Sequence, residues 1–191
     1  MTGKLKSNIL LALPVVAALN SAAPAAERPP EPSSYRMEEY RAPVPATLQG
    51  ARIVSTEEAA ALLRDKRALF IDVMPHTPKP AKLPAGTIWR EKVRMNIPGS
   101  VWLPNVGYGA ISKDDTDYFR AALESLNSGG KGSEILFYCM TDCWMSWNAA
   151  KRAIEWGYGS VIWYPMGADG WERDGHSLTE AKPYVIRQIE Q

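Results

Sequence analysis

Short apolar runs recur along the chain and are separated by segments with helical periodicity. Runs of strand length lie at residues 53–54, 68–73, 101–103, 135–138 and 161–164. Continuous apolar runs without polar alternation are typical of strands buried on both faces of a parallel sheet. The pattern therefore predicts five strands distributed from residue 53 onward.

Two helices are predicted by their N-terminal capping residues. Ser55 with Glu58 three residues later forms a capping box, and it predicts a helix that runs to about residue 65. Ser112 with Asp115 repeats this arrangement, and apolar residues at helical spacing follow until a Gly-Gly pair.

Two further helices are predicted toward the C-terminus. Residues 145–156 have small apolar residues at helical spacing and are followed by Gly157, a typical stop signal. Another helix is predicted from Pro183 onward. This alternation predicts a single α/β domain with a central parallel sheet and helices on both faces. Functional residues of such sheets lie at the carboxyl ends of the strands. The segments leaving these ends are 74–96, 104–112, 139–144 and 165–171.

The first 50 residues have a different character. Residues 1–26 combine two lysines, a short apolar stretch and an A-x-A site, which together predict a secretory signal peptide. The apolar stretch is shorter than the roughly 20 residues that span a bilayer, although an uncleaved anchor or a buried helix is the alternative. Residues 27–50 are expected to form an extended proline-rich linker, and residues 51–191 the domain. The expected location is the periplasm, with no membrane association after cleavage.

Composition and charge exclude some classes of partner. The chain has 191 residues, of which 46% are apolar, so it is large enough for one domain with a proper core. Its formal charge is +1 and no basic stripe appears, which argues against nucleic acid as a partner.

The two cysteines are the main candidates for chemistry. Cys139 and Cys143 are too few and too close together for a disulfide scaffold, so they are better interpreted as a site. Cys139 lies between a predicted strand and a predicted helix, where backbone N–H groups favour a thiolate. This placement favours a reactive thiol over the alternative of a buried apolar cysteine.

Several motifs in the same order resemble the rhodanese-like family. They are Leu-Phe-Ile-Asp-Val at 69–73, Ile-Pro-Gly-Ser-Val-Trp-Leu-Pro at 97–104, Tyr-Cys at 138–139, Gly-Tyr at 157–158 and Met-Gly-Ala-Asp-Gly-Trp at 166–171. The resemblance covers about residues 50–175 and implies the α/β fold described above. It also implies an active-site loop with Cys139 as the nucleophile, Cys143 as a second thiol, and Met140, Thr141, Asp142 and Trp144 around them.

The loop sequence Cys-Met-Thr-Asp-Cys-Trp also resembles the C-x-x-x-C-W signature of a bacterial subfamily. That subfamily is associated with alcohol catabolism dependent on pyrroloquinoline quinone (PQQ). The resemblance implies a pathway rather than a reaction, and it agrees with export to the periplasm.

One departure from the family pattern concerns charge. Sulfur-transferring rhodaneses have arginine five residues after the cysteine, where this chain has Trp144. Charge-assisted hydrogen bonds are roughly twice as strong as neutral ones, so efficient transfer from thiosulfate is not expected. Arg90, Lys92 or Arg94 is a possible replacement, since they leave the same edge of the sheet; the alternative is a solvated basic loop. Asp72 is expected to support the loop by accepting from its amides.

Three functions remain open from the sequence. The first is a sulfurtransferase-like or thiol–disulfide exchange enzyme without a cofactor, in which Cys139 carries a persulfide or a disulfide to Cys143. Its partner would be a small sulfur or thiol substrate. The second is a non-catalytic binding module for a periplasmic quinoprotein or cytochrome. The third and least favoured is a copper or zinc site that adds His76 to the cysteines.

Overall fold

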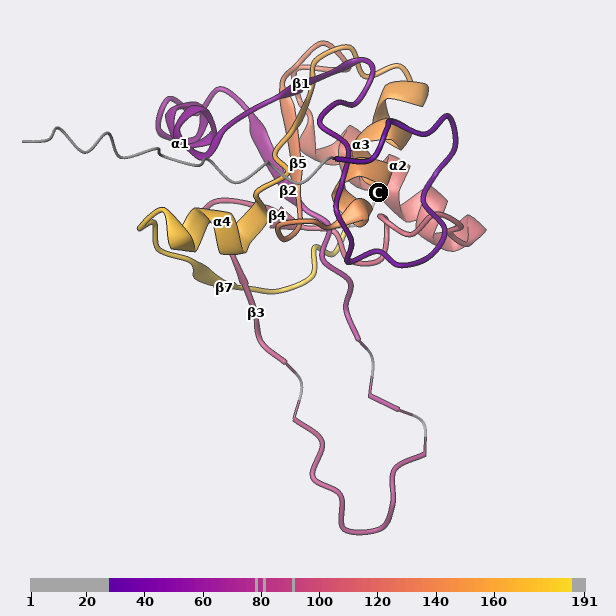
Figure 1. The fold of residues 1–191 in the computed structure, drawn as a ribbon. Coiled ribbons are helices and arrows are strands. Elements are labelled where there is room, and N and C mark those ends of the chain that lie inside the picture. The colour runs from indigo at the N-terminus through magenta and orange to yellow at the C-terminus, as the bar shows by residue number, and fades with distance from the viewer. Residues whose placement is uncertain (1–27, 78, 81, 91, 187–191) are drawn as a thin grey trace, which may run out of the picture.

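The computed structural model describes residues 28–77, 79–80, 82–90 and 92–186. A central sheet has the strand order β1-β6-β5-β2-β4 (Figure 1). Its strands are β1 (Ala51–Ile53), β2 (Leu69–Asp72), β4 (Val101–Trp102), β5 (Ile135–Tyr138) and β6 (Val161–Trp163). Every pair of neighbours in this sheet is parallel, which confirms the predicted parallel α/β architecture.

Helices cover both faces of the sheet, as predicted. They are α1 (Thr56–Arg64), α2 (Lys113–Leu126), α3 (Trp144–Glu155) and α4 (Gly167–Arg173). Successive residues of a strand point to opposite faces, and β5 therefore contributes to two cores. Leu136 and Tyr138 pack with α1 and α4, whereas Ile135 and Phe137 pack with α2 and α3. Figure 1 shows the sheet between these two layers.

The first two helices begin at the predicted caps. The Ser55 hydroxyl accepts from the Glu58 N–H, and the Glu58 carboxylate accepts from the Ser55 N–H in return. The Ser112 hydroxyl accepts from the Asp115 N–H in the same way. Each cap satisfies backbone donors that a helix N-terminus leaves without a partner.

A second, small sheet pairs two distant segments that the sequence pattern did not predict as strands. Strand β3 (Arg94–Asn96) is antiparallel to β7 (Thr179–Ala181). The helix predicted from Pro183 is wrong for residues 183–186, which are extended. Pro183 forms an isolated parallel β-bridge with Trp102, and the backbone N–H of Tyr184 donates to the Trp102 carbonyl at 2.9 Å. This segment therefore runs along β4. Residues 187–191 lie outside the described residues.

Residues 28–50, here called the arm, are extended and pack against the domain. Val44 and Leu48 are buried in the core beside α3. The Asn148 side chain holds the Arg36 backbone: it accepts from the Arg36 N–H at 2.9 Å and donates to the Arg36 carbonyl at 2.9 Å.

The predicted signal peptide, residues 1–26, lies outside the described residues. Within the described part, no helix is long and apolar enough to cross a membrane.

The chain between β2 and β3 projects away from the rest of the domain (Figure 1). Residues 74–93, here called the insertion, run outward from the sheet edge and return to it (Figure 1). The described residues of the insertion contain no helix or strand. Its two ends meet next to the carboxyl ends of β2 and β5, and therefore next to Cys139.

Candidate functional site

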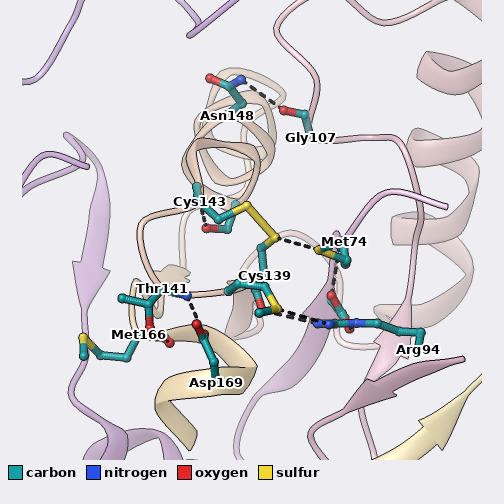
Figure 2. Close-up of a disulfide and its surroundings, with 12 residues drawn as sticks. Met74, Arg94, Gly107, Cys139, Thr141, Cys143, Asn148, Met166 and Asp169 are labelled. Atoms are coloured by element: carbon teal, nitrogen blue, oxygen red, sulfur yellow. Dashed lines mark hydrogen bonds and ion pairs between the residues drawn. A yellow bond between two sulfur atoms is a disulfide. The ribbon is translucent and has the colours of Figure 1, made fainter. Parts of the chain in front are cut away.

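Cys139 and Cys143 are joined in a disulfide (Figure 2). Cys139 follows the last residue of β5, and Cys143 immediately precedes α3. Their Cα atoms are 6.2 Å apart, which lies within the range that disulfides span. Both side chains are buried, with relative exposures of 0% and 2%. The predicted pair thus lies at the carboxyl edge of the sheet, where a site is expected.

The two cysteines occupy different electrostatic environments. Helix α3 begins at Trp144, so its N-cap is Cys143 rather than Cys139. The sequence pattern predicted Cys139 for this favourable helix-start position. The N-terminal end of a helix favours negative charge, so α3 would favour negative charge at Cys143 rather than at Cys139.

The loop between the cysteines is fastened to α4. The Thr141 N–H donates to the Asp169 carboxylate and its hydroxyl donates to the Met166 carbonyl, each at 2.6 Å. The backbone N–H of Ala168 donates to the Cys139 carbonyl at 3.0 Å. Gly167 has φ +59°, and a Cβ there would lie 2.4 Å from the Met140 Cα, so this close approach requires glycine. Asp169 was not among the predicted site residues; its position in the Gly-Ala-Asp-Gly motif is the signal that was available.

A buried ion pair adjoins the loop. The Arg94 Nε donates to the Asp72 carboxylate at 2.6 Å, and the exposures of these side chains are 10% and 0%. Arg94 also donates to the Cys139 carbonyl at 3.3 Å, so it reaches the loop backbone. Burial raises the pKa of Asp72 above its ordinary value of 3.8, while the charge of Arg94 opposes that rise. Asp72 accepts from the Met74 N–H rather than from loop amides.

Trp144 occupies the place of the family's arginine, and the arm covers it. Its backbone N–H donates to the Tyr40 carbonyl at 2.9 Å, and the Arg36 guanidinium lies 5.4 Å from the centre of its ring. The backbones of Arg41 and Cys143 form an isolated antiparallel β-bridge, so the arm crosses the loop between the two cysteines. Only 3% of Trp144 is exposed.

The next bases along α3 do not replace the missing arginine, because they are engaged elsewhere. Arg152 donates to the carbonyls of Val106, Tyr108 and Gly109. Lys151 pairs with Glu155 and lies over the ring of Trp147.

A cavity of about 300 Å³ lies where the two ends of the insertion meet. Its walls include Met74, His76, Trp89, Arg90, Trp102 and Met140. The Met74 sulfur is 3.5 Å from the Cys139 sulfur and separates the disulfide from the cavity. The exposed side chains of Arg90 and Lys92 line this cavity. Among the three cations predicted to approach the cysteine loop, Arg94 is therefore the one that reaches it in the described structure.

His76 belongs to the wall of this cavity. Its ring meets the ring of Trp102 edge-on, with centroids 5.6 Å apart, and its backbone N–H donates to the Asn105 side chain. Within the described residues, no group of three or more His, Cys, Asp or Glu side chains is arranged to hold a metal ion.

Comparison with known proteins gives one family match. A family model described as the rhodanese-like domain matches residues 55–174. No curated protein matches the chain. Among solved structures, the chain is similar to a thiosulfate sulfurtransferase from Pseudomonas aeruginosa, with 15% identity and a TM-score of 0.46. That match covers 73% of this chain and 22% of the sulfurtransferase, so the chain spans less than a quarter of that protein. An uncharacterized protein from Saccharomyces cerevisiae is 19% identical, with a TM-score of 0.41, over 65% of this chain and 93% of the yeast protein.

Proposed function

Because the chain belongs to the rhodanese-like domain family, we propose that it carries out thiol chemistry at Cys139, with Cys143 as the resolving thiol. The observation that supports this proposal best is the disulfide between the end of β5 and the N-cap of α3. The reaction would be thiol–disulfide exchange on a scaffold of the sulfurtransferase type.

The environments of the two sulfurs determine the direction of attack. The sulfur of Cys139 lies behind Met74 at the cavity, whereas Cys143 lies beneath the arm. A substrate thiolate entering by the cavity would attack the Cys139 sulfur after the Met74 side chain moves aside, and the bond to Cys143 would break. Cys143 would leave as a thiolate stabilised by the N-terminus of α3, which makes it the better leaving group.

The exchange is completed by a second thiol of the substrate. That thiol would attack the substrate sulfur of the mixed disulfide and release the Cys139 thiolate. The substrate would then have lost two electrons as a disulfide, and the protein would hold two thiols. A second disulfide substrate would reoxidise the pair by the reverse steps.

Transfer of sulfur from thiosulfate is less well supported by the loop. A dianionic donor needs a cation or free amides around the cysteine. Here Trp144 replaces the arginine, and its amide and that of Thr141 already donate to Tyr40 and Asp169. Persulfide transfer remains a second candidate, because Arg94 brings one guanidinium to the Cys139 carbonyl.

We further propose that the protein acts in the periplasm, in association with PQQ-dependent alcohol catabolism. The signal-peptide pattern at residues 1–26 supports export. The Cys-Met-Thr-Asp-Cys-Trp sequence supports the pathway by its resemblance to the subfamily signature. The alternative function is a non-catalytic module that binds a quinoprotein or a cytochrome.

Intact mass before and after reduction and alkylation tests the proposal. The protein purified from the periplasm should be two hydrogens lighter than its reduced form and should gain two alkyl groups after reduction. An added sulfur atom on Cys139 would instead establish persulfide transfer. Two thiols that are already free and resist alkylation would contradict both reactions and favour the binding module.

A further inference from the structure

Three sulfur atoms from separate parts of the fold converge at the candidate site. The Met74 thioether follows β2, Cys139 follows β5, and Cys143 precedes α3. The Met74 and Cys139 sulfurs are 3.5 Å apart. A disulfide sulfur carries no proton, so this is a direct contact between sulfurs rather than a hydrogen bond. Figure 2 shows the Met74 sulfur directed toward the disulfide, whereas the Met166 sulfur points away from it.

We propose that, once the disulfide is reduced, Cys139, Cys143 and Met74 bind one Cu(I) ion. Thiolates and thioethers are soft ligands, and soft ligands select Cu(I) among biological metals. Structural zinc sites instead take four ligands, drawn from Cys, His and carboxylates. The described part of the chain offers no group of three or more such side chains, so this donor set favours copper over zinc.

Charge and burial favour a cation at this place, and the soft donors select Cu(I) as that cation. Two thiolates in a dry site would carry two negative charges, and burying unpaired charge is costly. One Cu(I) leaves a single negative charge. The N-terminus of α3 lies at Cys143, and the Arg94 guanidinium lies at the Cys139 carbonyl, so both sulfurs have positive potential nearby.

The same two cysteines would alternate between a disulfide and a metal site. A dithiol reductant supplies two electrons and two protons, which convert the disulfide into two thiols. Cu(I) then replaces the two thiol protons, which pass to solvent, since metal ligands must be deprotonated. The cavity of about 300 Å³ has Met74 and Met140 in its walls, and Met74 lies between it and Cys139, so an ion entering there would meet the Met74 thioether first. Copper binding requires only the reduced pair, so it is tested separately from disulfide exchange.

Anaerobic titration with Cu(I) against the chelator bathocuproine disulfonate tests this site. The reduced full-length protein should remove one Cu(I) per chain from the chelator, and the oxidised protein should remove none. Absence of uptake by the reduced protein would overturn the proposal. Uptake that is equal in the oxidised protein would also overturn it, because the ion would then be bound elsewhere.

A matched pair of variants tests the role of the thioether. Met→Leu substitutions conserve volume, so both variants should fold and form the disulfide. Loss of an outer-shell partner alone typically weakens metal binding about 10- to 100-fold, so Met74→Leu should weaken Cu(I) binding at least about tenfold. Met166→Leu should leave it unchanged, because that sulfur points away from the pair. Equal Cu(I) affinities of Met74→Leu and the wild type would contradict the assignment of Met74 as a ligand. Nitrogen ligands in the copper X-ray absorption spectrum would also contradict it.

Discussion

Trp144 shows how one residue changes what the loop can accept. Its ring is buried beneath Arg36 and packs edge-on against Trp147, with ring centroids 5.5 Å apart. An arginine at this position would face Arg36 and lose those ring contacts. The contacts of the arm therefore favour tryptophan over arginine at this position.

We expect Trp144→Arg to lower the free energy of unfolding by about 3 kcal/mol or more, the usual cost of losing a buried aromatic side chain. It should not create thiosulfate sulfurtransfer, because the arm still covers the position. Chemical denaturation and a thiocyanate assay measure these two effects. Trp144→Phe is the control and should lose less stability. Rapid thiocyanate formation by the arginine variant would show that the missing charge alone limits the reaction.

Arg94→Met should destabilise the protein in a pH-dependent way. Removing one partner of a buried ion pair typically costs about 3–5 kcal/mol. Without Arg94, burial should raise the pKa of Asp72 still further above 3.8. A carboxyl whose pKa is raised by folding stabilises the fold fully below its unfolded pKa, and this stabilisation is lost as pH rises through the folded pKa.

The loss in Arg94→Met should therefore be larger near neutral pH than at about pH 4, as measured by urea unfolding at both pH values. The double variant with Asp72→Asn has no carboxyl to titrate, so it should lose this pH dependence. A loss in Arg94→Met that is equal at both pH values would contradict the assignment to Asp72.

Local sequence signals identified the candidate residues but not their contacts. Cys139 and Cys143 were predicted from their placement between a strand and a helix, and the structure brings them together. Arg90, Lys92 and Arg94 were equivalent by sequence. Arg94 differs from the other two because it lies on β3, whose pairing with β7 joins segments more than 80 residues apart. Such a contact leaves no local pattern.

The same distinction holds for whole elements. Capping residues, helical spacing and apolar runs predicted the parallel strands and the helices α1, α2 and α3, because these signals lie within each element. The arm was predicted as an extended linker because its prolines interrupt helix and sheet. Its packing against α3 depends on Asn148, whose side chain bonds to both the backbone N–H and the carbonyl of Arg36. That contact joins residues 112 positions apart.

We expect Asn148→Ala to loosen the arm. The substitution removes the partners of the Arg36 N–H, the Arg36 carbonyl and the Gly107 carbonyl. Leaving buried polar groups without a partner costs about 1–3 kcal/mol. Hydrogen exchange of residues 36–44 should become faster.

Asn127→Ala is a matched control, because the Asn127 side chain donates to the Gly130 carbonyl and not to the arm. It should lower stability without changing exchange in the arm. Equal exchange of residues 36–44 in both variants would show that Asn148 does not hold the arm in place.

At the scale of the molecule, the disulfide should contribute little to stability. It links residues separated by only four positions, and so short a loop restricts the unfolded chain by about 2 kcal/mol, against about 4.7 kcal/mol for a loop of 100 residues. Reduction should therefore lower the free energy of unfolding by about 2 kcal/mol and leave the protein folded.

Guanidinium unfolding with and without reductant measures this difference. The double variant Cys139→Ser with Cys143→Ser should be insensitive to reductant. Unfolding of the wild-type protein on reduction alone would contradict a pair that changes its redox state in the folded protein.

The arm also imposes an order of events on a newly made chain. Its contacts with α3 close loops of about 100 residues or more, as between Thr47 and Trp147, which are 100 positions apart. The two cysteines close a loop of only four positions. Contacts between distant segments form more slowly than local ones. We therefore expect the two cysteines to come together locally before the arm packs over Cys143.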